Sequence, residues 1–161
     1  MSRSLYIGAV SALTDIHHWG VVLTTLAVIS MIIGLHYEVL RNCIRFLPVV
    51  THQRRRRVIF LILIIMTTHV VEIWIFGTAH YVLMQWESFG TIYGEVSVNG
   101  LLDYVYYSSM VYTTVGFGDL IPEGPIRFMS GMEALTGLTM ITWSASFTFL
   151  EMQRDWRVGR N

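Results

Sequence analysis

Three long apolar runs constrain the possible folds of this chain more than any other feature of its sequence. They cover about Trp19–Leu40, Val58–Trp86 and Ile126–Leu150. Each run has at least the roughly 20 residues that a helix needs to cross a hydrocarbon core about 30 Å thick. A chain of 161 residues that is 53% hydrophobic and 14% charged is also too small to bury its apolar surface in one water-soluble core. The sequence therefore predicts a membrane protein with three transmembrane helices.

Two clusters of arginine predict which ends of these helices face the cytoplasm. They lie at Arg41–Arg57 and at Arg154–Arg160. Since the cytoplasmic flanks of membrane helices are enriched in Lys and Arg, we expect both clusters inside and the N-terminus outside. A nucleic-acid partner is not expected, because its binding surface would spread basic residues over a soluble face. Aromatic residues typical of membrane interfaces stand at the ends of the runs, at Trp19, Tyr37, Tyr81, Trp86 and Trp156.

The segment between the second and third runs carries acidic residues and no basic residue, which agrees with an outside location. Its first part, Glu87–Gly100, is rich in Gly and Ser and is expected to be irregular. Leu101–Tyr112 is apolar and aromatic and predicts a short helix that starts at Asn99–Gly100. This helix is too short to span, so we expect it to enter the membrane and return. Re-entrant backbone is tolerated only where protein buries it or where it lines a water-filled path, which indicates a pore.

The residues after the short helix carry the most specific motif of the sequence. They read Thr113-Thr114-Val115-Gly116-Phe117-Gly118-Asp119. Between a short aromatic helix and an apolar run, this string resembles the selectivity filter of the potassium-channel pore superfamily. The resemblance extends from about Val58 to Leu150 and implies a two-helix pore unit, to which this chain adds an N-terminal transmembrane helix. Because one chain supplies one filter strand, the resemblance implies a homotetramer around a fourfold axis.

The resemblance also implies a role for each residue of the filter. In such filters backbone carbonyl oxygens replace the hydration shell of the K⁺ ion. The K⁺-binding residues of this filter would be Thr114, Val115, Gly116, Phe117 and Gly118. The first four of them would supply the carbonyl oxygens. Glycine adopts positive φ readily, so Gly116 and Gly118 would let consecutive carbonyls face one axis. The Thr114 hydroxyl would add the innermost oxygen, and Val115 would pack behind the filter.

Four further residues would support the filter, again by resemblance. Phe117 would point away from the pore and pack against Tyr106 and Tyr107 of the short helix. It stands where many relatives have Tyr, and K⁺ selectivity is still expected. Asp119 would attract cations and hold the outer end of the filter, and Thr113 precedes its first carbonyl.

The third run resembles the inner, pore-lining helix. Gly137 lies where the family often has a hinge glycine, but close packing of helices is an equal alternative. Glu133, one turn before it, is a carboxylate at membrane depth, where charge usually points at protein or water. It would either brace the filter from behind or lie at the helix end in the interface.

His69 and Glu72 in the second run lie at i and i+3 and share a helix face at membrane depth. A buried hydrogen-bonded pair that reaches His36 or another polar group is one interpretation. A proton-sensing role in gating is the other, because His titrates near neutral pH. No metal site is assigned, since isolated histidines with a single cysteine, Cys43, are weak evidence for one. No cofactor is expected other than K⁺ ions in the filter.

These observations predict an all-α membrane protein with three transmembrane helices, a re-entrant pore helix and a selectivity filter, assembled as a fourfold tetramer. Residues 1–57 would form the N-terminal helix and cytoplasmic loop, 58–150 the pore domain, and 151–161 a cytoplasmic tail. The predicted function is passive, K⁺-selective conduction without catalysis, in contact with membrane lipids. The absence of a predicted soluble domain favours a bacterial inner (plasma) membrane.

Three other functions stay open from the sequence. A non-selective cation channel could use the same loop, because ion occupancy depends on surroundings that the motif does not encode. A non-conducting membrane scaffold could retain a filter-like loop. A small membrane enzyme or redox subunit would have to bind a metal or haem through His36, His69 and His80.

Overall fold

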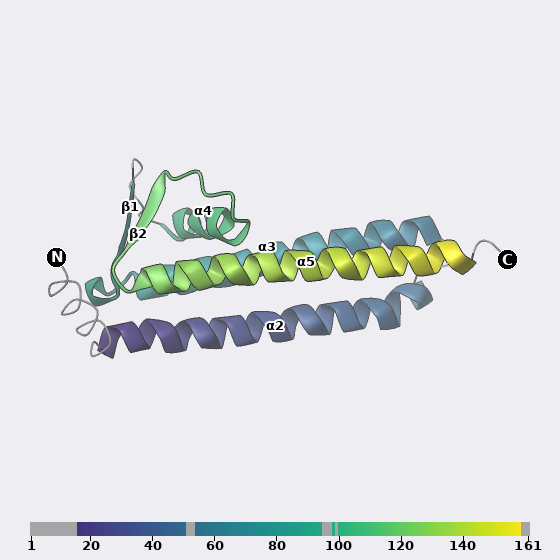
Figure 1. The fold of residues 1–161 in the computed structure, drawn as a ribbon, viewed down its shortest axis with the longest axis horizontal. Coiled ribbons are helices and arrows are strands. Elements are labelled where there is room, and N and C mark those ends of the chain that lie inside the picture. The colour runs from purple at the N-terminus through teal and green to yellow at the C-terminus, as the bar shows by residue number, and fades with distance from the viewer. Residues whose placement is uncertain (1–15, 51–53, 95–97, 99, 159–161) are drawn as a thin grey trace, which may run out of the picture.

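The structure is a computed structural model that describes residues 16–50, 54–94, 98 and 100–158. Within these residues there are four α-helices: α2 (Ile16–Val50), α3 (Arg54–Leu83), α4 (Leu101–Tyr112) and α5 (Ile126–Val158). The helices α2, α3 and α5 run side by side along the long axis, and the short α4 lies beside them at one end (Figure 1). Helices α2 and α5 contain and extend their predicted apolar runs, α3 begins four residues before its run and ends at Leu83 instead of Trp86, and α4 has the predicted bounds.

Two helical stretches among the described residues are long and apolar enough to cross a membrane. They are Ile16–Phe46 of α2 and Arg56–Leu83 of α3. The third long helix, α5, is less apolar because Ser, Thr and Gly recur along it. Two candidate spans are therefore established by length and composition, and a transmembrane α5 stays a prediction.

A small sheet corrects the prediction of irregular structure over Glu87–Gly100. A 3₁₀ turn at Glu87–Phe89 leads into β1 (Thr91–Gly94), which pairs antiparallel with β2 (Leu120–Glu123). The register places Gly94 opposite Leu120. The pairing joins the two chain segments on either side of α4, so local composition could not reveal it. Because β2 begins directly after Asp119, the sheet holds the end of the loop that follows α4.

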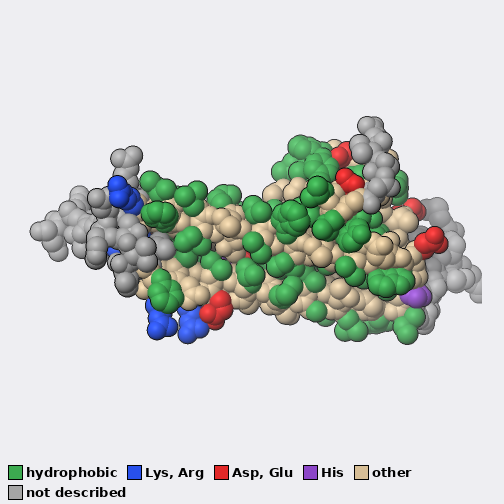
Figure 2. Space-filling view, turned by 180° about the vertical axis from the view of Figure 1, so that it is seen from behind, with side chains coloured by type: hydrophobic (Ala, Val, Ile, Leu, Met, Phe, Trp, Pro, Cys, Tyr) green, Lys and Arg blue, Asp and Glu red, His purple; other side chains and the backbone are tan. Residues whose placement is uncertain are grey.

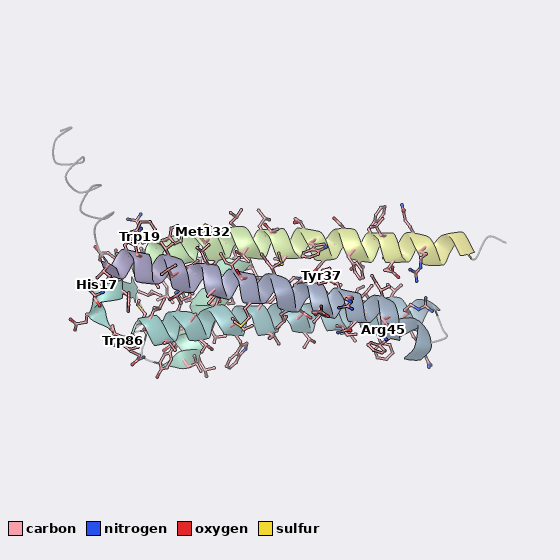
Figure 3. The ribbon with its side chains drawn as sticks, turned by 90° about the horizontal axis from the view of Figure 1, so that it is seen from below. His17, Trp19, Tyr37, Arg45, Trp86 and Met132 are labelled. Atoms are coloured by element: carbon pink, nitrogen blue, oxygen red, sulfur yellow. The ribbon has the colours of Figure 1, made fainter. Side chains whose placement is uncertain are left out.

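The surface is apolar along the helices and charged at their ends. Exposed hydrophobic side chains are scattered along the visible face of the bundle, Arg side chains lie at one end with an acidic side chain beside them, and further acidic side chains lie towards the end that carries the sheet (Figure 2). Trp19 and Trp86 lie at the sheet end, and Arg45 lies towards the other (Figure 3). This distribution is the one expected for helices in a lipid environment.

Several polar side chains are buried in the interior of the described part of the chain. An apolar core that includes Phe76, Tyr112, Met129 and Met140 lies where α4 meets the long helices. Buried polar groups require hydrogen-bond partners, and most of those named here belong to two networks described below. The buried polar residues are Thr25, His36, Thr68, His69, Glu72, His80, Ser108, Ser130, Glu133, Thr136 and Ser144.

Candidate functional site

The candidate site is the loop that leaves the C-terminal end of α4. At the other end of α4, the Asp103 carboxylate accepts the Gly100 backbone N–H at 2.9 Å, as expected for a helix start. The last turn is closed by the N–H groups of Thr113 and Thr114, which donate to the carbonyls of Ser109 and Val111. The chain then turns away from the helix at Thr113–Asp119 and continues into β2.

The backbone of this loop takes left-handed conformations at every second residue. The φ angles are 59° at Thr114, 52° at Gly116 and 80° at Gly118. Positive φ at the glycines agrees with the sequence-based expectation. Positive φ at Thr114 was not predicted, because a β-branched residue rarely adopts it. Such strained conformations are concentrated at functional sites.

The loop is exposed in the single chain. The relative exposure is 55% at Val115 and 69% at Phe117. Within the described residues Phe117 makes no ring contact with Tyr106 or Tyr107, so the expected packing of these aromatics does not occur inside one chain. Packing of Val115 and Phe117 in an assembly of several chains stays a prediction.

Tyr106 and Tyr107 instead hold the site through their hydroxyl groups. Tyr106 donates a hydrogen bond of 2.8 Å to the Asp119 carboxylate, which ties α4 to the far end of the loop. This bond raises the pKa of the Tyr106 hydroxyl. Tyr107 is buried and donates to the Ser130 hydroxyl of α5 at 2.7 Å. The two tyrosines therefore link α4 to the loop and to α5.

A buried network connects α3, α4 and α5 beside this helix. Glu133 of α5 has no exposed surface. One of its oxygens contacts the Ser108 hydroxyl, and the other lies 2.7 Å from Nε2 of His80. The Ser108 hydroxyl is also 2.9 Å from the Ile73 carbonyl oxygen. Of the two interpretations of Glu133, burial against α4 agrees with a bracing role and disagrees with an exposed helix-end carboxylate.

Gly137 allows α5 to approach the end of α4. A Cβ atom at this position would overlap the backbone carbonyl of Tyr112. A second close approach occurs at Gly77 of α3, where a Cβ atom would stand 2.8 Å from Cα of Val105. The structure therefore assigns close packing to Gly137, and α5 continues as a helix through it.

A second buried network includes Tyr112, the last residue of α4, and joins all four helices. His36 Nδ1 lies 2.8 Å from Glu72 Oε1, and His69 Nδ1 lies 2.9 Å from Glu72 Oε2. The Tyr112 hydroxyl donates to Glu72 Oε2 and lies 3.1 Å from His69 Nδ1. The Ser144 hydroxyl of α5 is 3.0 Å from His36 Nε2. His69 and Glu72 thus reach His36, and they also reach residues of α4 and α5 that the sequence did not single out.

The arrangement suits passive ion passage better than covalent chemistry. Residues 113–118 are exposed, while the histidines and glutamates of the two networks are buried and hydrogen-bonded. His80, the third histidine of the metal or haem alternative, is fully buried beside Glu133. It therefore does not join His36 and His69 in one site.

Comparisons with known proteins agree with this assessment. A family model described as an ion channel matches residues 68–154, which include the end of α3, the whole of α4, the exposed loop and most of α5. Neither the curated proteins nor the solved structures contain a match. Since the matched segment covers more than half of the chain, it shows the family. The chain is a membrane protein that belongs to the ion channel family whose pore domain has two transmembrane helices.

Proposed function

We propose that this chain is one subunit of a homotetrameric, K⁺-selective channel, with Thr113–Asp119 as its selectivity filter. The observation that carries the proposal is the left-handed backbone at Thr114, Gly116 and Gly118. In an extended strand successive residues alternate in direction. A left-handed residue at every second position reverses the orientation of every second peptide group. This cancels the alternation of an extended strand, so that successive carbonyl groups can face the same side. Four such strands would surround a K⁺ ion with the oxygens that replace its hydration shell.

The exposure of the filter segment supports the tetramer. Val115 and Phe117 are large apolar residues that are more than half exposed in the single chain. A loop of this composition in a membrane protein needs protein around it or a water-filled path beside it. Neighbouring copies of the chain would supply both, because a fourfold arrangement brings the loops together around one axis.

The composition of α5 fits a helix that lines a water-filled cavity and crosses the membrane as the third span. Thr139, Thr142 and Ser146 are exposed on α5, and their hydroxyls donate to carbonyls one turn earlier. A helix that faces lipid on one side and water on another is less apolar than a helix that faces lipid all round. This composition agrees with the lower apolar character of α5 compared with α2 and α3.

The location of charges favours the orientation with the arginine clusters in the cytoplasm. Arg41 and Arg45 near the end of α2, Arg56 at the start of α3 and Arg154 near the end of α5 are all exposed. The excess of basic residues at cytoplasmic ends then places Thr113–Asp119 towards the outside. We propose a bacterial inner membrane as the location.

Ion flux from liposomes that contain the purified protein tests the function. We expect K⁺ efflux to exceed Na⁺ efflux, and we expect Gly116→Ala to abolish the difference, because an L side chain is strained at a φ of 52°. Gly34→Ala is the matched control: Gly34 lies in α2, and within the described residues an added Cβ meets nothing within 4 Å at either glycine. Gly116→Asp is a stronger disruption of the same position.

The same experiment separates the alternatives. Equal K⁺ and Na⁺ fluxes would favour a non-selective cation channel. If neither ion moves, K⁺-dependent thermal stabilisation of the tetramer decides: its presence indicates a closed channel and its absence a scaffold. A Gly116→Ala variant that elutes as a tetramer and conducts as the wild type would contradict the filter assignment.

A further inference from the structure

The network around Glu72 has the donor set of a metal site, a role that goes beyond the hydrogen-bonded pair and the proton sensor considered from the sequence. We propose that His36, His69 and Glu72 bind a divalent transition-metal ion of the Zn²⁺ class. The three ligand atoms, one from each side chain, all lie within 4.8 Å of one another. Two imidazole nitrogens and a carboxylate oxygen form a recurrent three-residue ligand set for Zn²⁺. The tertiary structure creates the site, because α2 supplies one ligand and α3 supplies two.

The ligand atoms are close enough to surround an ion, but they have to rearrange when it binds. Ligand atoms around a tetrahedral ion with bonds of about 2.1 Å stand about 3.4 Å apart. His36 Nδ1 lies 2.8 Å from Glu72 Oε1, and His69 Nδ1 lies 2.9 Å from the other oxygen, Oε2. Each of these pairs would have to open by about half an ångström. Since one ligand atom from each residue lies within 4.8 Å of the others, the most distant pair would have to close.

The surroundings supply the outer contacts that metal ligands usually have. A metal-bound histidine normally donates its second ring N–H to a neighbouring acceptor, which fixes the tautomer. His36 Nε2 lies 3.0 Å from the Ser144 hydroxyl. With His36 protonated at Nε2, its Nδ1 lone pair faces Glu72 and is available to the ion. Tyr112 donates to Glu72 and orients the carboxylate.

The site borders a cavity on the side of His69. This cavity of ≈ 490 Å³ between α3 and α5 is lined by His69, Tyr112 and Ser144. A bound ion could take its fourth ligand, a water molecule or the Tyr112 oxygen, on this side. His36 and Glu72 are fully buried, and His69 keeps 8% of its surface exposed. His69 is therefore the ligand that faces the cavity.

Burial of Glu72 adds an electrostatic argument. A carboxylate in the membrane-spanning part of α3 is unfavourable unless a positive charge compensates it. No Arg or Lys side chain contacts Glu72 among the described residues, and its polar partners are His36, His69 and Tyr112. The two histidines compensate the carboxylate only when they are protonated, whereas a divalent cation bound between neutral imidazoles would compensate it directly. It would also join α2 to Tyr112, the last residue of α4, directly before the proposed filter.

The test measures metal binding by the untagged, full-length protein purified in detergent and treated with a chelator. We expect one Zn²⁺ or Co²⁺ ion per chain, and the Co²⁺ form should show the intense visible bands of a four- or five-coordinate ion. His36→Gln, His69→Gln and Glu72→Gln should abolish the bands. Ser144→Ala should weaken metal affinity by about 10- to 100-fold, the usual effect of removing an outer contact of a ligand.

The control variant is His80→Gln. It removes the other buried histidine that contacts a carboxylate, Glu133, where no second histidine is present among the described residues. A second control, His17→Gln with His18→Gln, removes two histidines near the start of α2. Both controls should retain one ion per chain and the Co²⁺ bands. Elution as a single peak verifies that each variant is folded.

Either of two results would overturn the proposal. One is a wild-type protein that takes up no Co²⁺ or Zn²⁺, which leaves the network as hydrogen bonds alone. The other is a wild-type level of binding in folded ligand variants, which places the ion elsewhere. The wild-type spectrum decides the first point even if the ligand variants fail to fold. Binding is measured without ion flux, so its result is independent of the proposed channel function.

Discussion

Ser108 of α4 and Glu133 of α5 share a buried hydrogen bond one helical turn before α4 ends at Tyr112. The bond ties the short helix that leads into the exposed loop to one of the long helices. His80 of α3 contacts the second oxygen of the same carboxylate at 2.7 Å. The carboxylate therefore connects three helices, and the position of the loop depends on it.

Removal of the Ser108 hydroxyl should destabilise the protein. In Ser108→Ala one oxygen of the buried Glu133 carboxylate loses its contact, and an unsatisfied buried polar group costs about 1–3 kcal/mol. We expect a lower thermal unfolding midpoint in detergent. Ser109→Ala is the matched control, because among the described residues the Ser109 hydroxyl donates only to the Tyr106 carbonyl of its own helix. Equal midpoints for the two variants would show that the Ser108–Glu133 bond contributes no stability.

Removal of the Tyr106 hydroxyl should weaken conduction. Tyr106→Phe deletes the donor to Asp119 and leaves the outer end of the loop less ordered. If the ordered, conducting loop loses about 1 kcal/mol of stability, its population falls by about fivefold. We therefore expect K⁺ flux to fall by about fivefold, measured in liposomes at equal protein content. Tyr104→Phe serves as the control, because among the described residues its hydroxyl makes no hydrogen bond and its ring packs edge-on against Tyr81. Similar fluxes for the two variants would exclude this role for Tyr106.

An added methyl group at Gly137 should separate α5 from α4. The Cβ atom of Gly137→Ala would overlap the Tyr112 carbonyl, and overpacking of this kind costs about 1–3 kcal/mol. We expect a lower unfolding midpoint. Gly34→Ala meets nothing within 4 Å among the described residues and should cause no loss of stability, since Ala favours a helix by about 1 kcal/mol relative to Gly. A Gly137→Ala variant as stable as the wild type would contradict the close packing.

Labelling of single cysteines should reveal the orientation. In a Cys43→Ser background, Thr91→Cys at the exposed start of β1 and Arg154→Cys near the end of α5 place thiols at opposite ends of the bundle. We expect a membrane-impermeant maleimide to label Thr91→Cys in intact cells. Arg154→Cys should react only after permeabilisation. The reverse pattern would show that the arginine clusters lie outside.

The local features of the fold could be predicted from the sequence. Hydrophobic runs identified the long helices because a helix in lipid needs a continuous apolar surface. The apolar and aromatic segment Leu101–Tyr112 predicted α4 with its bounds. Gly116 and Gly118 indicated positive φ because glycine tolerates it. The motif Thr113–Asp119 identified the family, since its residues are adjacent in the chain and need no tertiary information.

Other features depend on how the helices pack, and the sequence could not determine them. The rotation of each helix about its axis decides which side chains meet, so the contact of His36 with Glu72 and of Ser144 with His36 became visible only in the structure. The pairing of β1 with β2 joins segments that α4 and the loop separate.

The left-handed conformation of Thr114 opposes the residue's own preference, so the sequence could not predict it. The sequence by itself determined the family and the local elements, because these depend on neighbouring residues. The tertiary structure decided the two buried polar networks, because each joins side chains from three or four helices whose mutual packing no local pattern encodes.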